Sequence, residues 1–155
     1  MLFFSETLHF NDQYDGWVQG PPLLEAREYH ACAIIPRTSY EDGSADVIVV
    51  AGGRDVDEVA LTSTELLVNG QWMKGPDLPK PLSEPTLVSL GNAGVVLMGG
   101  TVGLFGESSD SIYRLACGDA FDDCEWMEMG VSLVADRYGH SVIDVDDTLP
   151  LCNFE

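Results

Sequence analysis

Short apolar segments separated by polar turns run along almost the whole chain. They are rich in β-branched residues, and Gly, Pro, Asn or Asp bounds each one. No segment keeps the 3.6-residue apolar period of an amphipathic helix. We therefore predict an all-β protein, with strands near 6–10, 17–20, 29–35, 46–52, 63–68, 71–74, 85–90, 94–99, 111–116, 124–128 and 139–145.

One turn in this pattern is specified by its own residues. Asn69 and Gly70 separate the apolar run 63–68 from the run 71–74. Both residue types tolerate the positive φ that a type I′ turn requires, and this turn suits a two-residue hairpin. The two runs are therefore predicted to pair as antiparallel neighbours.

The chain repeats itself with a period near 55 residues. Trp17, Trp72 and Trp126 lie 55 and 54 positions apart, and each is followed within four positions by a glycine. Each tryptophan also follows a segment of alternating apolar and polar residues. Within one period the order is two apolar runs, a long loop, an alternating run, a tight turn and the tryptophan strand. Each period thus predicts four short strands.

Two other sequence features share the period. The first is an Arg-x-x-His motif, and the second is a diglycine that closes an apolar run. Because repeated positions follow architecture, we expect these residues to be structural, with the two arginines joining neighbouring repeats. The residues are Arg27 and His30, Arg137 and His140, Gly52 and Gly53, and Gly99 and Gly100, together with Trp72 and Trp126.

These diglycines, tryptophans and Arg-x-x-His motifs resemble the Kelch-repeat β-propeller family over about residues 6–145. The sequence departs from the family pattern at Leu66, where an aromatic residue is usual, and at Pro85, which stands where the neighbouring repeats have histidine. The resemblance implies blades of four antiparallel strands. It divides the chain into the last two strands of a blade (1–25), two full blades (26–79 and 80–134) and the start of a further blade (135–155).

Two or three blades are too few to close a propeller, which typically needs four to eight. We therefore expect an incomplete, open propeller. One explanation is that the missing blades belong to a longer chain. Another is a homodimer, in which the N-terminal hairpin of one chain completes the last blade of the other. The absence of a diglycine run in 146–155 counts against the second explanation.

The charge of the chain limits its partners. It has 26 acidic and 7 basic residues, which gives a formal net charge of −19. Such a charge repels phosphate backbones and anionic headgroups, and no apolar run approaches the roughly 20 residues of a membrane span. Nucleic-acid and membrane roles are therefore not expected, and a protein partner should be basic.

Catalytic and metal-binding motifs are missing from the sequence. It contains no H-E-x-x-H, no pair of C-x-x-C motifs and no G-x-S-x-G. The glycines from Gly99 to Gly106 do not have the G-x-G-x-x-G spacing of a dinucleotide site. We expect no catalytic residue, no metal and no cofactor.

Cys117 and Cys124 flank the insertion 118–123, which we expect to be a turn between the last two strands of a blade. They would then face each other across a hairpin. A disulfide here would indicate an oxidising compartment, whereas two free thiols would suit a cytosolic protein. The pair favours an extracellular origin slightly and does not determine the compartment.

The long connections between second and third strands, 54–63 and 101–110, are expected to lie on one face with the links between blades. Arginine and aromatic residues often dominate the energy of protein interfaces. Alternatively, Phe105 folds back onto its own blade, and the acids form a solvated loop rather than a calcium site. The candidate partner-binding residues are Arg54, Asp55, Asp57, Glu58, Leu104 and Phe105.

The resemblance implies a non-catalytic protein–protein interaction module that binds through these loops. Two alternatives remain. Because the family includes copper oxidases with Kelch-type blades, the chain could be a fragment of such an enzyme. It could also have no autonomous function and merely complete a larger propeller.

Overall fold

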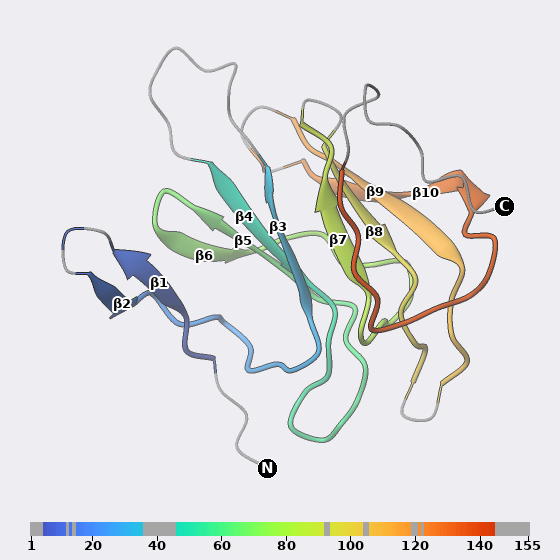
Figure 1. Ribbon diagram of the computed structural model, residues 1–155, viewed down its shortest axis with the longest axis horizontal. Coiled ribbons are helices and arrows are strands. Elements are labelled where there is room, and N and C mark those ends of the chain that lie inside the picture. The colour runs from blue at the N-terminus through green and yellow to red at the C-terminus, as the bar shows by residue number, and fades with distance from the viewer. Residues whose placement is uncertain are drawn as a thin grey trace, which may run out of the picture.

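Antiparallel β-strands are the regular elements of the computed structural model, which describes residues 5–11, 13, 15–35, 46–91, 94–103, 106–118, 121 and 123–144 (Figure 1). Within this part of the chain, one hairpin pairs β1 with β2. Two four-stranded sheets follow, each a simple meander. The strands are β1 Leu8–Asn11, β2 Gly16–Gln19, β3 Ala31–Ile35, β4 Val47–Ala51, β5 Thr64–Val68, β6 Gln71–Lys74, β7 Thr86–Ser89, β8 Val95–Met98, β9 Ser111–Ala116 and β10 Glu125–Ser132.

We call β1–β2 the N-terminal hairpin, β3–β6 the first sheet and β7–β10 the second sheet. The first, second and third links are residues 20–30, 75–85 and 133–140, which follow β2, β6 and β10. No helix in the described residues is long and apolar enough to cross a membrane.

The central strands of each sheet are apolar because both of their faces are covered. In β4, Val47 and Val49 are fully buried, and in β8 so are Val95 and Leu97. Strands buried on both faces have nearly continuous apolar sequences, as these do. The core lies between the two sheets, and β3 runs beside β7 at their junction.

The second and third links dock in the same way on the sheet that precedes them. The backbone N–H of Gly53 donates to the carbonyl oxygen of Leu82 at 2.9 Å, and that of Gly100 donates to the carbonyl oxygen of Arg137 at 2.9 Å. These two contacts are related by the repeat. The repeat is therefore present in the tertiary structure as well as in the sequence.

The docking explains why β4 and β8 are each followed by a diglycine. Gly52 and Gly99 have φ values of +65° and +67°, which disfavour residues with a Cβ. A Cβ at Gly52 would overlap the carbonyl oxygen of Leu82, and one at Gly99 would overlap that of Arg137. Close backbone approach is therefore the role that the structure shows for these glycines.

The prediction of an all-β chain with four-stranded antiparallel sheets is confirmed. Asn69 and Gly70 have φ values of 51° and 79°, as the predicted turn requires. The strand predicted at 124–128 is longer, because β10 continues past an irregularity between Glu128 and Ser132.

The strand predicted at 139–145 does not form over 139–144, the part of that range that the structure describes. Residues 139 and 140 instead make two separate hydrogen bonds with the end of the second link and the start of β7. The Thr86 hydroxyl donates to the carbonyl oxygen of His140, and the Gly139 N–H donates to that of Glu84. A strand needs a continuous partner, and these contacts do not provide one.

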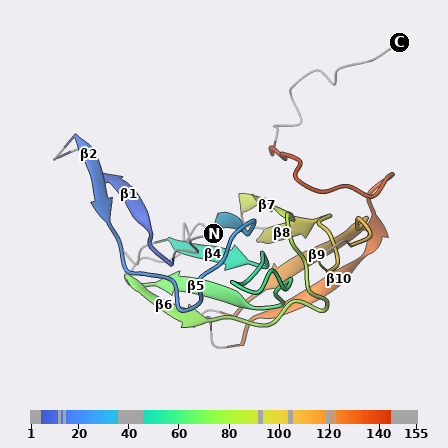
Figure 2. The ribbon, with the colours of Figure 1, turned by 90° about the horizontal axis from the view of Figure 1, so that it is seen from below.

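Neither sheet closes on itself. Figure 2 shows the strands as an open arc, with the N-terminal hairpin at one end and the chain after β10 at the other.

Candidate functional site

The connections between β4 and β5 and between β8 and β9 project from the same end of the sheets as the three links (Figure 1). We call this the loop end. The predicted partner-binding residues Arg54, Asp55, Asp57 and Glu58 lie here. The other two, Leu104 and Phe105, lie outside the described residues. The loop 54–60 is described completely.

Arg54 and Asp55 hold this loop in shape. The backbone of Arg54 pairs with Glu28 and with Ala60, so that it closes the base of the loop. The Asp55 carboxylate accepts hydrogen bonds from the N–H groups of Asp57 and Val59, each at 2.9 Å. Such bonds are typical of aspartate in turns.

The Arg54 side chain also stays within the protein. Its guanidinium lies 5.5 Å from the centre of the Tyr29 ring and 4.0 Å from the Glu84 carboxylate. Tyr29 belongs to the first link and Glu84 to the second. Arg54 therefore joins two links to the loop, whereas the sequence had nominated it as a partner-binding residue.

The exposed side chains of the loop are two acids and two valines. Asp57 and Glu58 are exposed, as expected for partner-binding candidates. Val56 and Val59 are 59% and 56% exposed, and the sequence reasoning did not nominate them. A signal was present in the sequence, since both are apolar residues beside the acids of this loop.

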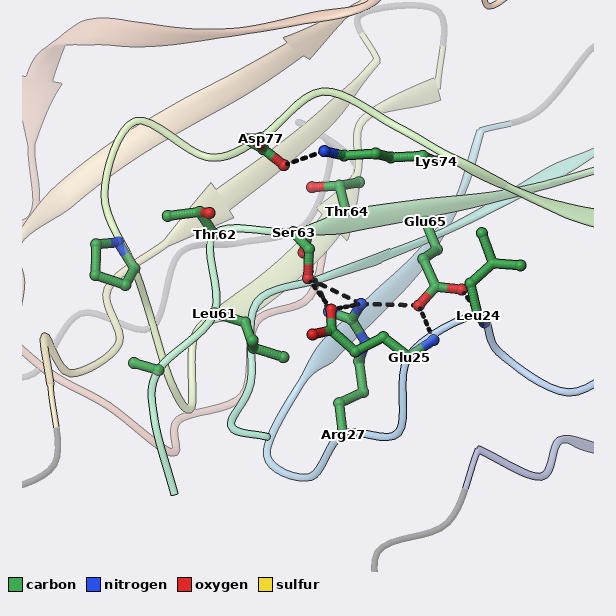
Figure 3. A pocket seen from close by; sticks show the side chains of 12 residues that line it. Leu24, Glu25, Arg27, Leu61, Thr62, Ser63, Thr64, Glu65, Lys74 and Asp77 are labelled. Carbon is green, nitrogen blue, oxygen red and sulfur yellow. Dashed lines mark hydrogen bonds and ion pairs between the residues drawn. The ribbon is translucent and has the colours of Figure 1, made fainter. Parts of the chain in front are cut away.

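A pocket of about 620 Å³ lies at the base of this loop. It is bounded by the first link, by residues 60–65, by Lys74 at the end of β6 and by the second link (Figure 3). Ala60 belongs to both the loop and the pocket wall, so the two features are continuous. The charged residues of the wall are Glu25, Arg27, Glu65, Lys74 and Asp77.

Arg27 is the buried cation of the pocket wall. Its Nη1 donates to the carbonyl oxygens of Gly52 and Ser63 at 2.9 and 3.1 Å. Its Nη2 donates to Glu65 at 2.8 Å and to Glu25 at 3.1 Å. Arg27 thus ties the first link to β4 and β5. Apart from Glu25, its partners lie in its own predicted blade, 26–79, so its role in joining neighbouring repeats stays a prediction.

The two carboxylates that contact Arg27, those of Glu25 and Glu65, differ in how accessible they are to a ligand. Glu65 is buried and also accepts from the N–H groups of Leu24 and Glu25 at 2.7 and 3.1 Å. Its lone pairs are therefore largely occupied. The Glu25 side chain keeps 42% of its surface exposed. Since Glu65 already balances Arg27, the Glu25 carboxylate adds negative charge at the edge of the pocket.

The charged cluster is not repeated in the second sheet. In the second sheet, Tyr113 holds the position of Glu65. Glu65 lies opposite the second-last residue of β4, and Tyr113 lies opposite the second-last residue of β8. There Lys80 lies 6.0 Å from the centre of the Tyr113 ring and donates to the Ser111 hydroxyl at 2.8 Å. The acidic pocket therefore departs from the repeat, as binding sites commonly do.

Arg137 does not reproduce the role of Arg27, although both arginines were predicted to join repeats. Its side chain is exposed, and its Nε donates only to the nearby carbonyl oxygen of Ala135 at 3.3 Å. The backbone of Arg137, rather than its guanidinium, makes the contact with Gly100. Among the described residues, this guanidinium makes no hydrogen bond or ion pair with another repeat, and its predicted role stays a prediction.

Both histidines of the Arg-x-x-His motifs have lowered pKa values. Loss of hydration lowers the pKa of His30, and the positive charge of Arg27 lowers it further. Loss of hydration also lowers the pKa of His140, with a smaller effect of Arg137. Both ring nitrogens of His140 are buried without a hydrogen-bond partner, and its ring lies against Gly99. His140 therefore packs against the diglycine of the second sheet.

Cys117 and Cys124 form a disulfide, and Cys32 is a free thiol. Ala116 lies opposite Glu125 in the β9–β10 ladder, which makes the two cysteines the next facing pair. The hairpin register alone therefore brings them together.

Reduction of this disulfide is expected to lower the free energy of unfolding by about 2 kcal/mol, because the bond closes a short loop in the unfolded chain. Urea unfolding with and without reductant measures the loss. A Cys117→Ser/Cys124→Ser variant serves as the control and should not respond to reductant. If reductant destabilised the variant as much as the parent chain, the effect would not come from this bond.

Among the described residues, no group of three or more His, Cys, Asp and Glu side chains is arranged to hold a metal ion. No family model matches the chain, and no curated protein shows significant similarity to it.

Proposed function

We propose that this chain is an arc of Kelch-type β-propeller blades that binds a basic segment of a partner protein at the loop end. The blade interpretation is supported by two four-stranded meanders and by the repeated docking of links on diglycines. The adjacent β3 and β7 would be the innermost strands of two blades.

The observation that carries the binding proposal is the continuity of the acidic pocket with the loop 54–60. The half-exposed Glu25 carboxylate offers an acceptor for a lysine or arginine side chain. Val56 and Val59 offer apolar contact beside the acids Asp57 and Glu58. A segment with alternating basic and apolar residues would match both features.

The net charge of −19 also favours a basic partner. A strongly acidic protein attracts cationic segments from solution and raises their association rate, most of all at low salt. Binding of such a segment should therefore weaken as salt is added.

The first test is titration of the chain with a 12-residue peptide of alternating Lys and Leu, followed by fluorescence anisotropy. The Asp57→Asn/Glu58→Gln variant should bind about tenfold more weakly, since each exposed charge pair contributes up to about 1 kcal/mol. The matched control is Glu125→Gln/Glu128→Gln, which removes the same charge from exposed positions on β10.

Equal weakening by both variants would show that binding follows net charge alone and would overturn the proposal of a site at the loop end. Equal binding of a peptide that alternates Glu and Leu would overturn the basic character of the partner.

A further inference from the structure

The tryptophans of the outer strands contact the part of the chain that precedes their own sheet. Trp72, on β6, donates from Nε1 to the carbonyl oxygen of Pro21 in the first link at 2.9 Å. Trp126, on β10, donates from Nε1 to the hydroxyl of Thr64 on β5 at 3.1 Å. The same kind of contact between neighbours thus occurs twice in the chain.

Trp17 holds the equivalent position in the N-terminal hairpin. No described strand or link precedes this hairpin to supply the contact that Trp72 and Trp126 make. Trp17 pairs with Phe10, just as Trp72 pairs with Leu67 and Trp126 with Leu115. Trp17 is 70% exposed and lies edge-on to Phe10, with 5.7 Å between ring centres. With the exposed Leu8, these residues form an apolar surface that we call the head face.

At the opposite end of the arc, the second sheet has a surface on which a tryptophan from another sheet could pack. Thr64 accepts the hydrogen bond of Trp126, and Ile112 holds the same position in the second sheet. Thr64 lies opposite the last residue of β4, and Ile112 lies opposite the last residue of β8. The outer strand next to Ile112 is β10. This strand and the turn after it expose a row of apolar side chains, which we call the tail face: Met127, Met129, Val131 and Val134.

We propose that the head face of one copy of this chain docks on the tail face of a second copy. The head face offers a tryptophan at the position that makes both internal contacts. The tail face lies on β10 and the turn after it, beside Ile112, which holds the position of Thr64 in the second sheet. Because different surfaces meet, the contact is heterologous and generates a ring or an open chain of copies. This inference does not depend on binding at the loop end.

Charge gives this association a distinctive salt dependence. Two copies with a net charge of −19 each repel one another, while the proposed contact is apolar. Added salt screens the repulsion and leaves the apolar contact intact. Association between copies should therefore strengthen with salt, whereas binding of a basic segment should weaken.

Sedimentation velocity on the whole chain at 50, 150 and 500 mM NaCl tests the proposal. We expect species heavier than the 16.8 kDa monomer, in amounts that rise with both protein and salt concentration. Trp17→Ser should raise the dissociation constant at least about tenfold, as should Val131→Ser/Val134→Ser. Val56→Ser removes an exposed apolar side chain from the loop end and is the matched control, which should not change it.

Mixing the two variants separates a head-to-tail contact from a symmetric one. The Trp17→Ser copy keeps an intact tail face, and the Val131→Ser/Val134→Ser copy keeps an intact head face. Each alone should be monomeric, and together they should form a dimer that does not grow further. Circular dichroism of each variant confirms that the sheets are retained.

A monomer under all three salt conditions would overturn the proposal. It would be overturned equally if oligomers persisted in both variants, or if Val56→Ser were as disruptive as Trp17→Ser.

Discussion

Replacing Trp126 by alanine is expected to lower the free energy of unfolding by about 3 to 5 kcal/mol, the usual cost of removing a large buried aromatic side chain. Trp126 is only 8% exposed, packs in the core between the two sheets and donates to the Thr64 hydroxyl. Its loss would leave a cavity and remove a contact between the sheets. Urea unfolding followed by circular dichroism measures the change.

Trp17→Ala is the matched control, because Trp17 holds the same position in the repeat and is largely exposed. It should change stability little when measured at low salt and low protein concentration, where copies remain separate. Equal losses in the two variants would contradict the view that a neighbouring sheet gives the tryptophan its stabilising role.

Replacing Arg27 by methionine is expected to lower the free energy of unfolding by about 3 to 5 kcal/mol, because it leaves Glu65 as a buried carboxylate without its cation. The Arg27→Met/Glu65→Gln double variant should recover part of this loss. The Leu24 and Glu25 N–H groups donate to different oxygens of Glu65, so the amide oxygen of the introduced glutamine would keep one of these two bonds, and the unbalanced charge would be gone. Urea unfolding of the four combinations completes a double-mutant cycle.

Arg137→Met is the control for this cycle, since the Arg137 side chain is exposed and makes only a local hydrogen bond. It should be nearly neutral. A large loss at Arg137, or no recovery in the double variant, would mean that the ion pair does not explain the effect at Arg27.

The strands and their pairing within each hairpin were open to prediction because their causes are local. Alternating apolar residues, turn residues and the Asn69-Gly70 dipeptide determine where a strand ends and how its neighbour aligns. The same reasoning placed Cys117 opposite Cys124. It did not anticipate that 139–144 would lack a strand, because a strand exists only where another backbone supplies hydrogen bonds.

The candidate site was only partly open to prediction. Asp57 and Glu58 are exposed in the structure, but Arg54 and Asp55 are occupied by contacts that hold the loop and links together. The pocket was not foreseen, because its walls come from the first link, β5 and the second link. Residues such as Glu25 and Lys74 come to line the same pocket only after the sheet has formed.

The period, the strand order and the diglycine positions could all be read from the amino-acid sequence, since strands and turns depend on residues close together in the chain and the period is the recurrence of the same motifs. What each repeated residue does depends instead on the packing of the sheets. Arg27 is buried and paired while Arg137 is exposed, and Trp126 is buried while Trp17 is open. The motifs are alike, but burial and pairing depend on what the adjacent part of the molecule offers, and at the two ends of the arc no described part of the chain supplies that neighbour.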